Sequence, residues 1–114
     1  MNRLHSQLFS GDPRLERCLV DDAAHVTLGC HGVFVGKIQY AVLVLQSGTI
    51  AGDELVAMRY GRDTAALVLA YKTRHRIINP RYQTKPDAIV GKMSIAALDF
   101  DMVLLERFSA RGTG

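Results

Sequence analysis

The sequence predicts a small all-α domain, and three observations indicate this fold class. Three segments, at about 33–47, 62–77 and 91–105, carry apolar residues at helical spacing. Glycine, asparagine-proline and hydroxyl residues that commonly begin or end helices stand at their edges. The chain of 114 residues is 48% hydrophobic and 22% charged, which is enough to bury one core without a disulfide or a metal. We therefore expect a three-helix bundle-like core with a short N-terminal helix and long connections.

The first expected helix is short and precedes this core. Asp12 suits the N-cap, where its carboxylate can accept hydrogen bonds from the first helical amides. Pro13 suits the first helical position, where no N–H group is needed. We expect this helix to cover about 13–19 and to end at Asp21-Asp22. The residues from Ala23 to Gly32 are expected to form an irregular loop.

The second apolar segment, 33–47, is apolar over most of its circumference. Val35, Ile38 and Val42 fall on one helical stripe, and the length of the segment favours a buried helix over a buried strand. Ser47-Gly48 is a typical C-terminal stop. Beyond it, Asp53 is expected to begin one short turn of helix.

The central helix is predicted to begin in the turn formed by Tyr60 and Gly61. Asp63 and Thr64 follow, and their side-chain oxygens suit the first helical amides, which lack backbone partners. Proline at position 80 disfavours helix at Asn79, so the helix should end near 76–78. One face is expected to be buried against neighbouring helices, and it consists of Thr64, Leu67, Val68, Tyr71 and His75.

The last predicted helix begins after a turn that repeats the pattern of the earlier one. In both turns a glycine precedes a helix whose first turn holds a hydroxyl residue, Thr64 or Ser94. The expected core stripe of this helix is Ile95, Leu98, Met102 and Leu105.

Together, the predicted helices divide the chain into a lead-in with the short helix (1–31), a main domain (32–106) and a flexible tail (107–114).

Charge and composition exclude few classes of partner. The formal charge is +3 and the pI is near 9.1, which permits an acidic partner without requiring one.

The sequence contains neither the apolar core of a signal peptide nor a run of about 18 apolar residues that could span a membrane. Export would therefore use another route or another part of a longer protein. Cys18 and Cys30 are expected to be free, partly buried thiols.

Three ordered motifs lie within residues 32–99. They consist of Val35 with Ile38-Gln39 and Leu43, Tyr60-Gly61 with Thr64, Ala66, Leu69 and Tyr71-Lys72, and Asp87 with Ile89-Val90-Gly91, Ser94 and Leu98. Together these motifs resemble the peptidoglycan-binding-like domain, a three-helix module attached to many bacterial cell-wall hydrolases. They differ from the family pattern at Ala57-Met58-Arg59, at Ala88 and at Lys72. The lead-in resembles a longer subclass associated with larger hydrolases or secreted effectors.

The resemblance implies non-catalytic binding of peptidoglycan, through its glycan or its stem peptides. Such a module would target an attached or partner hydrolase or toxin domain to the wall, so the periplasm or cell wall is the expected site of action. The sequence shows no phosphate loop, nucleophile elbow or metalloprotease motif, and we predict that this chain is not an enzyme and needs no cofactor. Neither nucleic-acid binding nor membrane insertion is expected.

Candidate binding residues are aromatic, charged or located in the long connection. Tyr60 could stack on a sugar ring or belong to the core, whereas Tyr71 is expected in the core. Among the basic residues, Arg62 and Lys92 occupy matching places in the two turns and are preferred partners for stem-peptide carboxylates. The aspartates are expected mainly to cap helices or brace turns. The full candidate set is Tyr60, Arg62, Asp63, Tyr82, Gln83, Asp87 and Lys92.

Three alternatives compete with this interpretation. A protein-protein adaptor or effector-docking module would need an exposed apolar patch, for which the candidates are Leu4, Leu8, Phe9, Leu105 and Phe108. A basic helix-turn-helix DNA binder ranks last, because the connection at 77–89 is longer than the usual turn. A zinc site formed by Cys18, His25, Cys30 and His31 is not expected, because their spacing matches no standard structural site.

Overall fold

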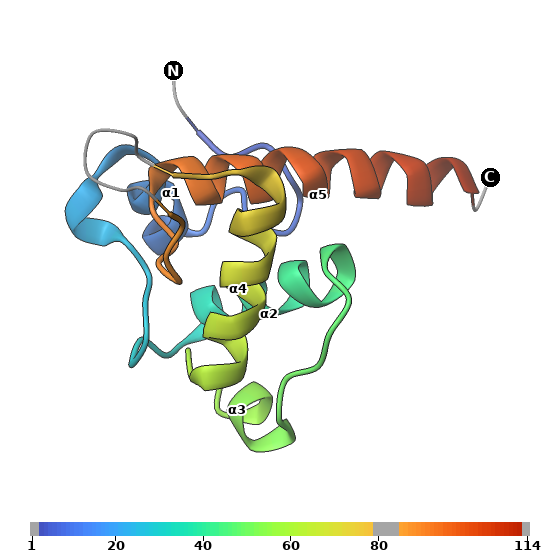
Figure 1. The fold of residues 1–114 in the computed structure, drawn as a ribbon. Helices are drawn as coiled ribbons and strands as arrows, with labels where there is room; N and C mark the ends of the chain where they lie inside the picture. The colour runs from blue at the N-terminus through green and yellow to red at the C-terminus, as the bar shows by residue number, and fades with distance from the viewer. Residues whose placement is uncertain (1–2, 79–84, 113–114) are drawn as a thin grey trace.

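Helices form the regular secondary structure of this protein. A computed structural model describes residues 3–78 and 85–112, and its all-α architecture confirms the predicted fold class. Only isolated β-bridges, not strands, occur in the described part of the chain. In chain order the elements are α1 (Pro13–Val20), the 3₁₀ turn η1 (Asp22–Ala24), α2 (Val33–Leu45), α3 (Gly52–Val56), α4 (Arg62–His75) and α5 (Lys92–Gly112) (Figure 1).

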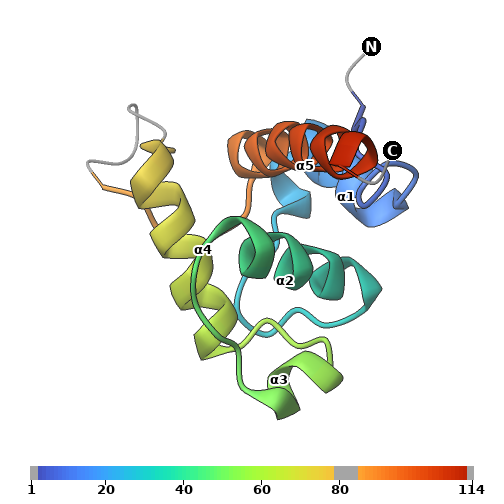
Figure 2. The same cartoon turned by 90° about the vertical axis from the view of Figure 1, so that its right-hand side faces the viewer.

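The long helix α5 organises the packing. It packs against α1 and α2, and α2 also packs against α4. Figure 2, which looks along α5, shows α1 and α2 on one side of it and leaves the opposite side uncovered. The expected stripe of α5 is confirmed at Ile95, Leu98 and Met102, which are buried, while Leu105 is half-buried. No helix within the described ranges is long and apolar enough to cross a membrane.

The N-terminal residues belong to the same core as the three main helices. Leu4 and Phe9 are 2% and 0% exposed, and both lie in one hydrophobic cluster with residues of α1, α2, α4 and α5. The exposed apolar patch that the adaptor alternative needs is therefore not formed by its five candidates, of which Leu4 and Phe9 are buried, Leu8 and Leu105 are half-buried and Phe108 is exposed. Side chains from distant helices hold this segment in place, since Asp99 accepts hydrogen bonds from the amides of His5 and Ser6.

The predicted end of the last helix is also wrong. The segment 107–112, assigned to a flexible tail, continues α5 as far as Gly112. At the predicted end, Glu106 is tethered to the N-terminal segment, because its two carboxylate oxygens accept hydrogen bonds from the amides of Gln7 and Leu8, at 2.8 and 3.1 Å. A helical turn that is tethered to another segment is less free to fray than a solvated one, which favours continuation of the helix at this point.

Helices α1 and α4 begin in different ways. As predicted, Asp12 caps α1 by accepting hydrogen bonds from the amides of Arg14 and Leu15. The N-cap of α4 is Gly61, which has no side chain to offer, and Asp63 does not cap this helix. Of the two roles predicted for Asp63, bracing a turn is the one observed, since it accepts a hydrogen bond from the amide of Ala51 at 2.8 Å, just before α3. The carboxylate that caps α4 comes from Glu54 of α3.

Candidate functional site

The loop before α2 ties the two helix-starting turns together. Val26 and Val90 exchange two backbone hydrogen bonds of 2.9 and 2.8 Å, which attach the loop to the turn before α5. The amide of Tyr60 donates to the carbonyl of Cys30 at 2.8 Å, which attaches the same loop to the turn before α4. The loop predicted as irregular therefore acts as a brace between both turns.

A buried polar network holds the motif residues of the first turn. Glu54, only 5% exposed, accepts hydrogen bonds from the amide and the hydroxyl of Thr64, at 2.7 and 2.5 Å. Gln39 of α2 donates to Thr64 Oγ1 at 3.0 Å and to the carbonyl of Arg59 at 2.9 Å. Thr64 and the side-chain amide nitrogen of Gln39 make their hydrogen bonds inside the protein, so these motif residues contribute to folding rather than to ligand contact. The buried Oε1 of Gln39 has no hydrogen-bond partner among the described residues.

Tyr60 is a core residue and not a sugar-stacking platform. It is 1% exposed, and its hydroxyl donates to the carbonyl of Ala88 at 2.5 Å, which links the two turns directly. Burial, with a smaller contribution from the charge of Asp87, raises the pKa of Tyr60 well above its ordinary value. The candidate role of Tyr60 in binding is therefore wrong. Tyr71 is buried as expected, and its hydroxyl donates to Asp101 at 2.7 Å.

We expect Tyr60→Phe to lower the free energy of unfolding by about 1 kcal/mol, which is the usual net contribution of one hydrogen bond. The aromatic ring stays in place in this variant, and only the hydrogen bond to the carbonyl of Ala88 is lost. Chemical denaturation followed by circular dichroism measures this effect. Binding to peptidoglycan should be unchanged in this variant. A variant that folds normally but no longer binds would instead indicate ligand contact by the hydroxyl.

The two preferred basic residues lie at different places in the fold. Arg62 is exposed at the start of α4, beside α3, whereas Lys92 begins α5 and pairs with Asp22 of η1 at 3.6 Å. Figure 1 shows that α4 begins at the lower end of the molecule, while α5 lies along its upper edge. The structure therefore does not unite Arg62 and Lys92 in one site.

A hollow lies between the C-terminal end of α4 and the first turn of α5. Its volume is about 450 Å³, and two predicted site residues, Asp87 and Lys92, line it. The other lining residues are Asp22, Lys72, Ile77, Ile78, Ile89, Gly91, Met93 and Ser94. Tyr82 and Gln83 lie outside the described residues.

Lys72 forms the polar support of this hollow. Lys72 is only 5% exposed, although its side chain carries a charge. Its ammonium donates to Asp87 at 2.7 Å and to the carbonyl of Ile89 at 2.6 Å. Asp87 also accepts from the amide of Ile89 at 3.1 Å, so its predicted role in bracing the turn is confirmed. The ion pair between Lys72 and Asp87 therefore holds the connection before α5 against the C-terminal end of α4.

The rim of the hollow offers both charge and apolar surface. The side chain of Lys92 is 44% exposed, so its ammonium can leave Asp22 and meet an anionic group. Met93, which is 53% exposed, and the half-buried Ile78 provide apolar contacts beside it. Helical periodicity indicates that Met93 lies outside the core stripe, but it does not reveal that a hollow adjoins it. This mixture suits a ligand with a carboxylate and short apolar side chains.

Comparison of the chain with protein-family models, with curated proteins and with solved structures finds no match.

Within the described ranges, no group of three or more histidine, cysteine, aspartate or glutamate residues is arranged to hold a metal ion. Both cysteines are free, and burial raises the pKa of the Cys18 thiol to about 11 despite the nearby charge of Arg14.

Proposed function

We propose that this chain is a non-catalytic module that binds bacterial cell-wall peptidoglycan at the hollow between α4 and α5. The observation that carries this proposal is the partly exposed ammonium of Lys92 beside the apolar surface of Met93, on a rim braced by Lys72 and Asp87. The ordered motifs that resemble the peptidoglycan-binding-like family support the choice of polymer. The module would bring an attached or partner hydrolase or toxin domain to the wall.

The chemistry of the hollow favours the stem peptides over the glycan strand. Stem peptides carry carboxylates, which can form charge-assisted hydrogen bonds with Lys92. Their alanine side chains are small enough to contact Met93 and Ile78 at the rim. The aromatic residue expected to stack on sugar, Tyr60, is buried, so the glycan loses its main candidate contact. Affinity should be modest, because a shallow hollow immobilises a polymer through few buried contacts.

We expect Lys92→Ala to weaken binding to insoluble peptidoglycan sacculi about tenfold, equivalent to ~1.4 kcal/mol. Co-sedimentation across a range of sacculus concentrations measures this change. Arg62→Ala is the matched control, since Arg62 is also an exposed cation in the first turn of a helix but lies away from the hollow. Circular dichroism checks that both variants fold.

Two further samples separate the possible outcomes. Chitin reports binding to glycan alone, and the soluble, peptide-free glycan strands that an amidase releases from sacculi serve as a competitor that reports whether the peptides are required. Sedimentation of the wild type with intact sacculi but not with chitin, unchanged by an excess of the peptide-free strands, supports the proposal. A wild-type protein that stays in the supernatant at low and high salt would overturn it, and equal losses in Lys92→Ala and Arg62→Ala would overturn the assigned site.

The adaptor alternative loses most of the patch on which it depended, because Leu4 and Phe9 are buried. Phe108, the exposed member of that patch, belongs to an apolar face of α5 instead.

A further inference from the structure

The outer face of α5 exposes large apolar side chains along the helix. Met93, Phe100, Leu104 and Phe108 are 53%, 64%, 39% and 69% exposed. Their spacings of seven, four and four residues place them on one side of a helix, with a slow drift around it. This stripe lies opposite the buried stripe of Ile95, Leu98 and Met102. The helix α5 is therefore apolar on two faces, of which the fold covers one.

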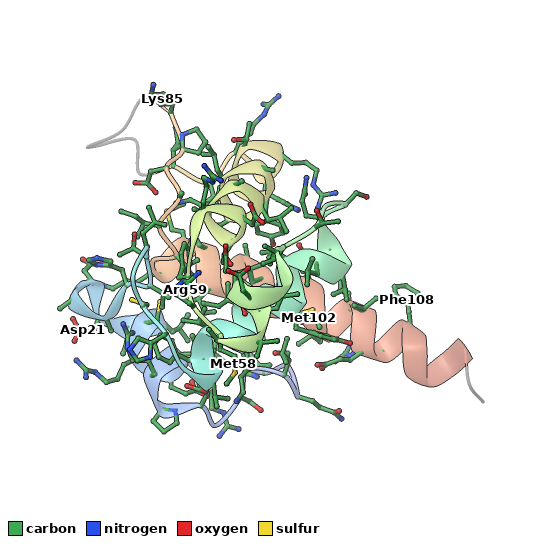
Figure 3. All side chains as sticks on the ribbon, turned by 90° about the horizontal axis from the view of Figure 1, so that it is seen from below. Asp21, Met58, Arg59, Lys85, Met102 and Phe108 are labelled. Carbon is green, nitrogen blue, oxygen red and sulfur yellow. The ribbon has the colours of Figure 1, made fainter. Side chains whose placement is uncertain are left out.

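The surroundings of α5 leave this outer stripe accessible. In Figure 1 the helix lies along one edge of the molecule, and its C-terminal turns extend past the end of α2. Figure 3 shows Phe108 pointing away from the body of the domain, whereas Met102 of the same helix lies within it. A hollow of about 860 Å³, lined by Phe100, Val103 and Leu19 among others, adjoins the stripe on the side of α1.

The two exposed rings supply about half of the area that a small dimer needs. A phenylalanine buries roughly 150–250 Å², so the exposed parts of Phe100 and Phe108 offer about 200–330 Å² on each copy. Two copies together would bury about 400–660 Å² from these rings alone, against roughly 1,000 Å² for a specific interface. Leu104, the half-buried Val103 and the exposed Ala96 add to this area. Met93 is not counted, because it lines the hollow of the proposed function.

We propose that the outer face of α5 binds a second copy of this chain, with the two α5 helices antiparallel about a two-fold axis near residue 102. In this register Phe100 of one copy lies opposite Leu104 of the other. Each Phe108 then lies opposite Ala96 and Ala97 of the other copy, so a large side chain meets two small ones. The contact is self-complementary, as a two-fold dimer requires, and the helix dipoles oppose each other.

Antiparallel pairing also separates the cations of the stripe. A parallel arrangement would bring Arg107 of one copy beside Arg107 of the other. The antiparallel arrangement places Arg107 opposite Ala97, where the aliphatic part of its side chain can cover apolar surface.

Sedimentation equilibrium of the full chain at several concentrations tests the proposal. We expect a concentration-dependent dimer for the wild type and a dimer dissociation constant at least ~10-fold higher for Phe100→Asp, because the aspartate places a charge at the centre of the interface. Val56→Asp is the control, since Val56 is 86% exposed on α3 and lies away from the stripe. A monomeric wild type at high concentration, or equal weakening by both substitutions, would overturn the proposal.

Cysteine cross-linking tests the orientation. In a Cys30→Ser background, we expect a disulfide to form when Phe100→Cys and Leu104→Cys proteins are mixed, and to form poorly in either protein alone. Efficient self-linking of Phe100→Cys would overturn the proposed register, because residue 100 lies beside its own counterpart only in a parallel pair or in an antiparallel pair whose axis passes near residue 100. Buried Cys18 is left unchanged because it is fully enclosed in the core.

Dimerisation would place two copies of the hollow on one particle and strengthen binding to a polymer through avidity. This consequence rests on the proposed function, whereas the dimer does not. A Phe100→Asp protein that still sediments with sacculi, but with lower apparent affinity, would support both. Failure of sacculus binding in a protein that dimerises would reject only the proposed function.

Discussion

Replacing Phe9 with alanine is expected to destabilise the protein by about 3–5 kcal/mol, the usual cost of truncating a buried aromatic residue. Phe9 is 0% exposed and belongs to the cluster that joins the N-terminal segment to the main helices. Its amide also donates to Ser6 Oγ at 3.1 Å within the turn that Asp99 holds. Urea denaturation followed by circular dichroism measures the change.

Phe108→Ala is the matched control for this experiment. It removes the same side chain from a position that is 69% exposed, so the free energy of unfolding should change by less than ~0.5 kcal/mol. Both variants are compared at concentrations where the chain is monomeric, since Phe108 belongs to the proposed dimer face. A loss below ~1 kcal/mol for Phe9→Ala would contradict the single core and favour a separable lead-in before residue 32.

Replacing Glu54 with alanine is expected to destabilise the protein by about 3 kcal/mol, because several buried donors lose their acceptor at once. Glu54 accepts hydrogen bonds from the amides of Gly61 and Thr64 and from the hydroxyl of Thr64. Gly61 cannot replace this cap with a side chain of its own. Thermal and urea denaturation of the variant measure the loss.

Asp53→Ala provides the control on the same short helix. The carboxylate of Asp53 is 82% exposed and lies 4.0 Å from Arg59, so its removal should cost no more than ~0.5 kcal/mol. Similar losses in Glu54→Ala and Asp53→Ala would show that the stability of α4 does not depend on the buried cap.

The same carboxylate predicts a dependence of stability on pH. Burial alone would raise the pKa of Glu54, but hydrogen bonds from Thr64, Asp63 and Gly61 outweigh it and hold the pKa below the ordinary value of 4.5. A lowered pKa means that Glu54 stabilises the fold above about pH 4.5 and that this contribution is lost as the pH falls through the folded-state pKa. Stability should therefore rise with pH through this acidic range.

The variant Glu54→Gln isolates this effect because it cannot ionise. We expect the wild type to exceed it in melting temperature near neutral pH, and the difference to shrink as the pH falls below about 4. Melting curves followed by circular dichroism at a series of pH values provide the comparison. A difference that stays constant from neutral to strongly acidic pH would contradict the lowered pKa.

The sequence predicted the helices better than it predicted the site. The starts of α1 and α4 agree with the structure because Asp12, Pro13 and Gly61 act on their immediate neighbours. The cap of α4 could not be predicted in this way, since Glu54 lies seven residues before Gly61 and reaches it only through the fold. Likewise, periodicity does not distinguish the buried Lys72 from an exposed lysine, because its partner Asp87 belongs to a distant connection.

The candidate site shows the same limit. Matching turns suggested that Arg62 and Lys92 act together, but similar local sequences can begin helices at different places in a fold, as they do here. Asp87 and Lys92 do line one hollow, although only the packing of α4 against the connection before α5 creates it. Tyr60 was predicted equally well as a ligand contact and as a core residue, since an aromatic side chain suits both environments.

The sequence by itself determined the all-α class, the approximate extents of four helices and most of the buried stripe of each main helix, because these follow from local spacing, caps and apolar content. Two expected core positions differ, since His75 is exposed and Leu105 is half-buried. Only the tertiary structure decided which charges are buried, that Leu4 and Phe9 complete the core, and that α5 continues beyond Glu106. It also decided where the hollow and the exposed stripe of α5 lie. These features depend on contacts between residues far apart in the chain, whose geometry no local pattern encodes.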